Sequence, residues 1–92
     1  MYKVYAIASL QRKFVYVGLT SDIKQRFQRH NRGFEKTTKP YAPFIIIYSE
    51  DAPDRKAARL KEIFLKSRSG KRFLYHIIQT QFSQLNQYFP SE

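Results

Sequence analysis

Two tyrosines, a glycine, an arginine and a histidine in the first third of this sequence have side chains suited to chemistry on a phosphate. Tyr5 and Tyr16 carry hydroxyls that can hold or transfer a proton. Arg26 and His30 are four positions apart, so they share one side of a helix and can hold a phosphate between them. Gly18 permits a close backbone approach by a ligand. The ordinary interpretation stays open too, because strand tyrosines mostly pack and a basic helix face is often simply solvated.

A lone glutamate in a basic segment is a further candidate. Glu62 is surrounded in the sequence by Arg55, Lys56, Arg59, Lys61 and Lys66. It can pair with basic neighbours three or four positions away. Alternatively, it can bind a hard divalent cation, because Mg²⁺ takes only one or two protein carboxylates and completes its shell with water and substrate oxygens. The spacing is compatible with both interpretations.

The segments that must position the two tyrosines have the pattern of a β-hairpin. Tyr2–Leu10 and Phe14–Leu19 are rich in β-branched and aromatic residues and are separated by a short polar break. If the loop contains an even number of residues, Tyr16 pairs with a residue near Ile7, and Tyr5 then lies on the same face as Tyr16. An odd loop without a bulge would place the two tyrosines on opposite faces.

The rest of the chain predicts three helices and one more strand. We expect a helix from about Ser21 to Arg32, a buried strand over Phe44–Glu50, and a helix from Pro53 to about Lys66. After a break at 67–70, a C-terminal helix over about 71–88 is expected to end at Pro90. It carries a helical apolar stripe made of Leu74, Ile78, Phe82, Leu85 and Phe89. The order is β-β-α-β-α-α in a single domain over 1–92.

The net charge is the strongest bulk property of the chain. With 17 Lys and Arg against 7 Asp and Glu, the 92 residues carry a net charge of +10. Such a small basic domain usually binds a polyanion, and we expect nucleic acid before an anionic membrane surface. The absence of cysteine excludes disulfides and thiolate chemistry. No apolar run is long enough for a membrane span and no secretory signal is present, so a cytoplasmic location is expected.

These residues, in this order, resemble the GIY-YIG nuclease domain. The first motif corresponds to KVY (Lys3–Tyr5), with lysine where glycine commonly stands, and the second to YVG (Tyr16–Gly18), with ten residues between the two tyrosines. The arginine and histidine of LTSDIKQRFQRH, the TK pair at Thr38–Lys39 and the glutamate of AARLKEIFLK follow in order. The resemblance covers a core of about residues 2–78. It is strongest to small stand-alone bacterial members related to the nuclease domain of the excinuclease, a DNA repair enzyme.

The resemblance implies an α+β fold with a small three-stranded antiparallel sheet flanked by helices, and a site on one face of that sheet. It implies an endonuclease that hydrolyses DNA phosphodiester bonds with one divalent metal, expected to be Mg²⁺ and bound by Glu62. The implied catalytic residues are Tyr5, Tyr16, Arg26, His30 and Glu62. The expected nucleic-acid contacts are Gly18, Lys24, Arg29 and Lys39.

The roles within that set follow from side-chain chemistry. Arg26 donates hydrogen bonds to the phosphate as charge builds up in the transition state. Tyr5 is the first candidate for the general base, because nearby Arg26 and a bound cation would both favour its phenolate. Tyr16 and His30 position water or assist proton transfer, and His30 is the alternative general base.

Two other functions compete with the nuclease. A non-catalytic basic module would bind nucleic acid through phosphate contacts alone. A helper protein would bind another protein through its aromatic C-terminal helix. The sequence contains no module for reading bases, so we expect structure-selective or weakly specific binding, with targeting by a protein partner or through a homodimer.

Overall fold

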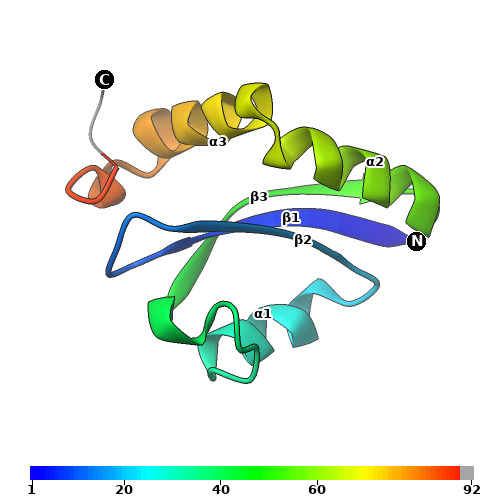
Figure 1. Cartoon of the computed structure of the whole chain (residues 1–92), viewed down its shortest axis with the longest axis horizontal. Helices are drawn as coiled ribbons and strands as arrows, with labels where there is room; N and C mark the ends of the chain where they lie inside the picture. Colours follow the sequence, from blue (N-terminus) through cyan, green and yellow to red (C-terminus); the bar gives the residue numbers. More distant parts are fainter. Residues whose placement is uncertain (90–92) are drawn as a thin grey trace.

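The computed structural model describes residues 1–89 as one antiparallel sheet with helices on both faces (Figure 1). In chain order the elements are β1 (Tyr2–Ser9), β2 (Val15–Thr20), α1 (Ile23–Asn31), the 3₁₀ turn η1 (Lys39–Tyr41), β3 (Phe44–Ala52), α2 (Arg55–Lys66), α3 (Arg68–Gln81) and the 3₁₀ turn η2 (Ser83–Leu85). The β-β-α-β-α-α order of strands and helices is confirmed. Within this part of the chain, no helix has the length and apolar character needed to cross a membrane.

The sheet has the strand order β2-β1-β3, which places β1 in the centre. Residues 4–9 of β1 are all buried, because strands flank β1 on both sides and helices cover both faces. The expectation of a fully buried strand over Phe44–Glu50 is wrong: β3 is an edge strand, and Ile45 and Ile46 are only half-buried. Apolar residues on both faces of a strand do not distinguish a central strand from an edge strand that lies under helices.

The β1–β2 hairpin has the register that brings the two tyrosines together. Ile7 pairs with Tyr16, and Tyr5 pairs with Gly18. The loop runs from Ser9 to Phe14, an even number of residues, and is closed by a hydrogen bond from the Ser9 amide to the Phe14 carbonyl oxygen at 2.9 Å. Tyr5 and Tyr16 therefore lie on the same face, as the even-loop alternative predicts.

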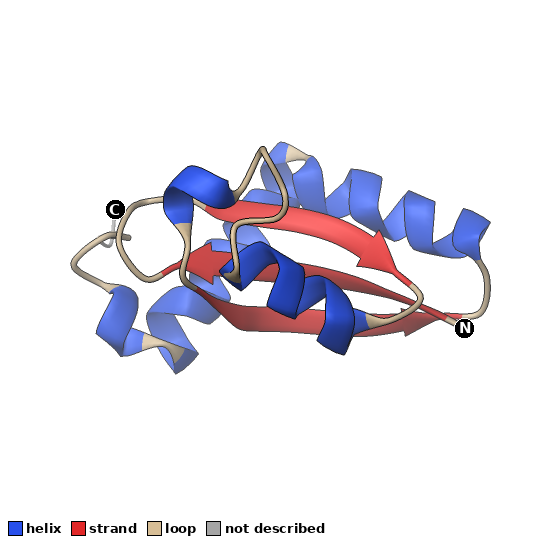
Figure 2. Ribbon diagram, turned by 90° about the horizontal axis from the view of Figure 1, so that it is seen from below, coloured by secondary structure: helices blue, strands red, loops and turns tan. Residues whose placement is uncertain are grey.

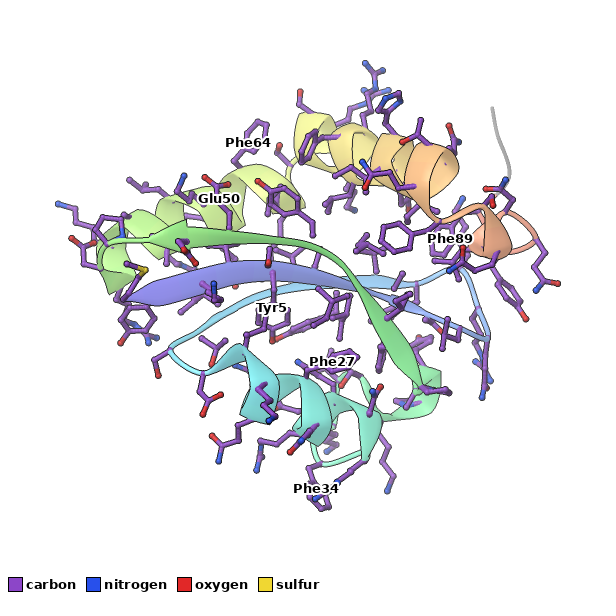
Figure 3. The ribbon with its side chains drawn as sticks, turned by 180° about the vertical axis from the view of Figure 1, so that it is seen from behind. Tyr5, Phe27, Phe34, Glu50, Phe64 and Phe89 are labelled. Atoms are coloured by element: carbon purple, nitrogen blue, oxygen red, sulfur yellow. The ribbon has the colours of Figure 1, made fainter. Side chains whose placement is uncertain are left out.

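Alternation along β1 divides the hydrophobic residues into two layers. Val4, Ala6 and Ala8 pack toward α2 and α3, whereas Tyr5 and Ile7 belong to a cluster with residues of α1. Figure 3 shows Tyr5 pointing from the sheet toward the α1 layer, and Figure 2 shows α1 lying across that face. The sheet therefore separates α1 from α2 and α3.

Side-chain caps set where the helices begin. The carboxylates of Asp22 and Asp54 accept hydrogen bonds from the amides of Gln25 and Ala57, at 3.0 and 2.8 Å, and so cap α1 and α2. Pro53 precedes the α2 cap and is not in the first turn, where the sequence analysis expected it. Its rigid backbone favours a chain reversal before the cap rather than the helical turn itself.

The C-terminal helix differs from its expected bounds. Ser67 caps the end of α2 and the start of α3, so α3 begins at Arg68 and not near residue 71. Gly70 lies inside the first turn of α3. Glycine is needed there because a Cβ at this position would be 2.1 Å from the Phe64 carbonyl oxygen. The helix ends at Gln81, and the apolar stripe continues to Leu85 in η2 and to Phe89 beyond it, both of which are buried. The expected stop at Pro90 lies outside the described residues.

Candidate active site

Four of the candidate residues meet on the α1 side of the β1–β2 hairpin. The Tyr5 hydroxyl lies 2.8 Å from His30 Nε2. The Tyr16 hydroxyl accepts a hydrogen bond from Arg26 Nη2 at 3.3 Å. The rings of Tyr5 and Tyr16 are 6.3 Å apart, and the Tyr16 and His30 rings are 4.9 Å apart. The hairpin supplies both phenols, and α1 supplies the guanidinium and the imidazole.

His30 is held in one orientation by hydrogen bonds on both ring nitrogens. Its Nδ1 lies 2.8 Å from the Thr38 hydroxyl, which donates to the Glu35 carbonyl oxygen at 3.4 Å. Because that hydroxyl proton is directed at Glu35, we assign the His30 proton to Nδ1, which leaves Nε2 to accept from Tyr5. Burial lowers the pKa of His30, so the neutral ring is favoured at pH 7.

Tyr5 is protonated in this arrangement. Its side chain is 1% exposed, and burial raises the pKa of its hydroxyl above the ordinary value of 10.0. Arg26 acts in the opposite direction, as expected, but burial outweighs it. Arg26 therefore does favour the phenolate, but among the protein's own groups burial keeps Tyr5 protonated. Tyr5 instead donates its proton to His30 Nε2.

Gly18 brings the Tyr5 hydroxyl close to the surface. A Cβ at this position would lie 2.7 Å from the Tyr5 hydroxyl oxygen and 2.9 Å from Tyr16 Cε2, closer than atoms pack without a shift. Gly18 also lines a pocket at this end of the sheet. Only a residue without a side chain allows the Tyr5 hydroxyl to lie directly beneath the pocket wall.

The pocket has a volume of about 740 Å³ and lies at the free edge of β2. Its lining combines Tyr16, Gly18 and Arg26 from the α1 side of the sheet with Leu19 and, from α2, Arg55, Lys56, Arg59 and Glu62 on the other side. Because α1 and α2 cover opposite faces of the sheet (Figure 1), the expectation of a site on one face is wrong. The lining residues meet around β2, where no further strand separates the two layers.

Glu62 is a buried carboxylate with two basic partners. Its side chain is 8% exposed; Oε1 lies 2.5 Å from Arg59 Nη1, and Oε2 lies 3.2 Å from Lys66 Nζ. These are the helical ion pairs that the spacing allows. Residues 1–89 contain no cluster of three or more metal-binding side chains. A single carboxylate at the wall of an open, polar pocket still fits Mg²⁺, which keeps most of its water shell.

Glu35 is a site residue that the sequence analysis missed. Its carboxylate accepts a hydrogen bond from Arg26 Nη2 at 3.3 Å and another from Arg29 Nε at 3.2 Å. Arg26 Nε lies 2.9 Å from Glu35 Oε2 but its N–H is not directed at that oxygen, so this contact is an ion pair without a hydrogen bond. Burial raises the pKa of Glu35, but Arg29 and Arg26 outweigh it and hold the pKa below 4.5. A lone acid just after Gly33, behind a helix with two arginines, is the signal that could have identified it.

Three of the expected nucleic-acid contacts lie outside the pocket lining. Lys24 is exposed on α1, Arg29 is paired with Glu35, and Lys39 lies beside Gly33. The basic side of the pocket comes instead from α2, where Arg55 and Lys56 are exposed and line the wall. Periodicity alone could not distinguish these two residues from the other basic residues of the same helix.

A family model described as the GIY-YIG catalytic domain matches residues 1–76, most of the chain. The chain belongs to the GIY-YIG family. Catalytic domains of this family are nucleases that act on nucleic acids and in general use a divalent metal ion. The expected family and fold class are therefore confirmed.

Relatives of similar size support this assignment. A UPF0213 protein from Orgyia pseudotsugata multicapsid polyhedrosis virus is 32% identical over 80 residues, covering 85% of this chain and 77% of that protein. A UPF0213 protein from Desulfotalea psychrophila is 32% identical over 81 residues, covering 84% and 72%. The solution NMR structure of a UPF0213 protein from Bacillus halodurans is similar in fold, with a TM-score of 0.53, 24% identity, and coverage of 95% of this chain and 96% of that one.

Proposed function

We propose that this protein is a metal-dependent endonuclease that hydrolyses DNA phosphodiester bonds. The observation that carries the proposal is a basic pocket lined by Arg26 and Glu62, with the Tyr5 hydroxyl directly behind Gly18 in its wall and hydrogen-bonded to His30. These groups supply a cation for the phosphate, a carboxylate for a metal and a path for a proton. Each of the three assists the hydrolysis of a phosphodiester.

Arg26 binds the scissile phosphate in this proposal. Glu35 and Tyr16 hold one edge of the guanidinium, and Nη1 donates to the Leu19 carbonyl oxygen at 3.3 Å. One N–H of Nη1 remains for a phosphate oxygen, in an orientation fixed before substrate arrives. Arg55 and Lys56 on the opposite wall bind flanking phosphates.

Tyr5 and His30 remove the proton from the attacking water. The water oxygen attacks phosphorus and the bond to the leaving oxygen breaks, while the water proton passes to the Tyr5 hydroxyl oxygen. Tyr5 passes its own proton to His30 Nε2, which already accepts a hydrogen bond from it. Because the two transfers occur together, no free phenolate is needed, which suits a tyrosine whose pKa is raised by burial.

Glu62 is the residue that would bind the metal. Bound there, Mg²⁺ would supply Lewis-acid stabilisation of the charge on the phosphate and leaving oxygens. Tyr16, which lines the pocket beside Arg26, orients the phosphate or the water through its hydroxyl. The small domain contacts backbone rather than bases, so we expect selectivity for DNA structure and not for sequence.

A cleavage assay tests the proposal. Duplex, single-stranded, flap and branched DNA would be incubated with the protein, with and without Mg²⁺. We expect cutting only with Mg²⁺, and its loss in Glu62→Gln with DNA binding retained. Glu50→Gln is the matched control, because Glu50 is paired with Lys61 outside the pocket and should cut as the wild type does.

The alternative is a non-catalytic basic module, favoured by the number of pocket cations. For such a module, Glu62→Gln would tighten DNA binding slightly and there would be no cleavage to lose. Absence of cutting on every substrate, with salt-dependent binding intact, would replace the nuclease proposal with this one.

A further inference from the structure

We propose that Arg59 is an exchangeable counter-ion of Glu62: it covers the carboxylate oxygen that a divalent cation needs, and once displaced it binds substrate phosphate in the same pocket. The inference rests on the proposed function and assigns a role to a residue outside the catalytic set.

The two basic partners of Glu62 differ in where they lie. Arg59 lines the pocket and contacts Oε1, whereas Lys66 contacts Oε2 and is not part of the lining. A cation that enters from the pocket therefore meets the oxygen that Arg59 covers. Lys66 can keep its contact with Oε2 when a cation binds at Oε1.

Arg59 also has the freedom that an exchange requires. Its side chain is 62% exposed, against 8% for Glu62. Within the described residues its only side-chain hydrogen bond is the one to Glu62, whereas Arg26 is fixed by Leu19, Tyr16 and Glu35. Ion pairs whose cation is exposed are weak, and Lys66 still compensates the buried carboxylate, so a strongly charged cation can replace the guanidinium at little cost.

Displacement gives the released guanidinium a new partner. It remains in a pocket lined by Arg26, Arg55 and Lys56, where the bound phosphate provides the nearest anion. Arginine matches phosphate oxygens with two parallel hydrogen bonds. Metal and DNA should therefore bind cooperatively, since each favours the state in which Arg59 has left Glu62, and the coupling must be reciprocal.

The first measurement is binding of Mn²⁺ alone, in the absence of DNA, by isothermal titration calorimetry. Arg59→Ala should bind Mn²⁺ about two- to fivefold more tightly than the wild type, because the competing ion pair is gone. Glu62→Gln should lose this site. Arg55→Ala is the matched control, as it removes a pocket arginine that does not contact Glu62, and it should leave Mn²⁺ affinity close to the wild-type value.

The second measurement is DNA affinity by fluorescence anisotropy with and without Mn²⁺, with Tyr5→Phe in every protein to prevent cutting. We expect the ratio of the two affinities to be about two- to fivefold smaller in Arg59→Ala than in its parent, on the same weak-pair argument. Arg55→Ala should weaken both affinities and leave the ratio unchanged. Circular dichroism checks that each variant is folded.

The exchange proposal would be overturned by an Mn²⁺ affinity of Arg59→Ala that is equal to or weaker than that of the wild type. It would also be overturned if the ratio of DNA affinities with and without Mn²⁺ did not change. The two proposals fail separately. A wild type that cuts DNA with Mg²⁺ while Arg59→Ala shows no gain in Mn²⁺ affinity contradicts only the exchange. A wild type that never cuts while both Arg59 measurements come out as expected contradicts only the nuclease.

Discussion

At the scale of single residues, the proposed mechanism moves the proton through a pair of residues rather than to one general base. Tyr5 is buried and protonated, and His30 is neutral with Nε2 directed at the Tyr5 hydroxyl. The choice between Tyr5 and His30 as the general base is therefore replaced by a pair in which both residues act. In the proposed mechanism, Tyr5 contacts the water and His30 keeps the proton.

Removing the Tyr5 hydroxyl should remove this path without disturbing the packing. We expect Tyr5→Phe to lower the single-turnover cleavage rate by about 10²–10⁴-fold, the usual contribution of a positioned acid or base. Tyr16→Phe keeps the Tyr5–His30 pair and should lose less. A larger loss in Tyr16→Phe than in Tyr5→Phe would show that the proton leaves through Tyr16.

The buried His30 should make folding stability depend on pH. Burial lowers the pKa of His30 in the folded protein below the ordinary value of 6.5, so the unfolded chain binds a proton first as the pH falls. The contribution of neutral His30 to the free energy of unfolding should be fully present above about pH 6.5. It should decline as the pH falls from there to the folded-state pKa. Urea unfolding at pH 7.5 and 5.5 measures this loss.

His30→Gln should reduce that loss, since glutamine does not titrate. His76→Gln is the control, because His76 is exposed on α3 and should leave the pH dependence as it is in the wild type. An equal loss of stability between the two pH values in wild type and His30→Gln would assign the effect to other groups.

The sequence predicted the reactive residue types but not their states. Tyr5, Tyr16, Arg26 and His30 were identified from motif and spacing. Their protonation depends on burial, which a motif does not give. Glu35 was missed because its role comes from a loop that returns to α1, and loop geometry has no periodic signal.

At the scale of elements, the α2–α3 junction is a tightly packed point of the fold. Ser67 caps both helices, and Gly70 lies against the Phe64 carbonyl oxygen and Leu65. The sequence predicted a break here, but its position and the start of α3 depend on this contact. Glycine normally indicates the end of a helix, whereas Gly70 lies within the first turn of one.

Alanine at position 70 should destabilise the fold. Alanine favours a helix over glycine by about 1 kcal/mol, but its Cβ would meet the backbone, and overpacking of this kind costs about 1–3 kcal/mol or more. We therefore expect Gly70→Ala to lower the free energy of unfolding, measured by urea denaturation. Ser69→Ala, at the exposed neighbouring position, is the control. Equal stability of the two variants would show that the backbone at residue 70 shifts freely.

At the scale of the whole molecule, a net charge of +10 acts together with a pocket at the sheet edge. The net charge predicted a polyanion partner correctly at the level of the family, whose members act on nucleic acids. It could not predict which cations contact that partner, because all basic residues count equally in a net charge. The arrangement of layers around β2 places Arg55 and Lys56, but not Lys24 or Lys39, in the pocket lining, so we expect the first two to contact DNA.

The salt dependence of DNA binding should reveal that selection. A phosphate contact contributes about 0.9 to the slope of log affinity against log salt concentration on duplex DNA. Arg55→Ala should therefore make the slope shallower by about 0.9, measured by fluorescence anisotropy across a salt series. Arg72→Ala, an exposed residue of α3 outside the pocket lining, should leave it unchanged. A shallower slope in Arg72→Ala with an unchanged slope in Arg55→Ala would indicate that DNA binds along α3 instead.

The free edge of β2 has a consequence for solubility. An open edge strand offers unpaired amides and carbonyls to any strand that approaches, and proteins commonly guard such edges with charge. Here the charged residues near the edge are Arg26, Arg55 and Arg59, which also line the pocket. Two molecules that met edge to edge would bring these arginines together, so charge repulsion would discourage aggregation through β2. Variants that neutralise several of these arginines at once should form insoluble assemblies more readily. An added polyanion should have the same effect, because it neutralises the charge that keeps two β2 edges apart.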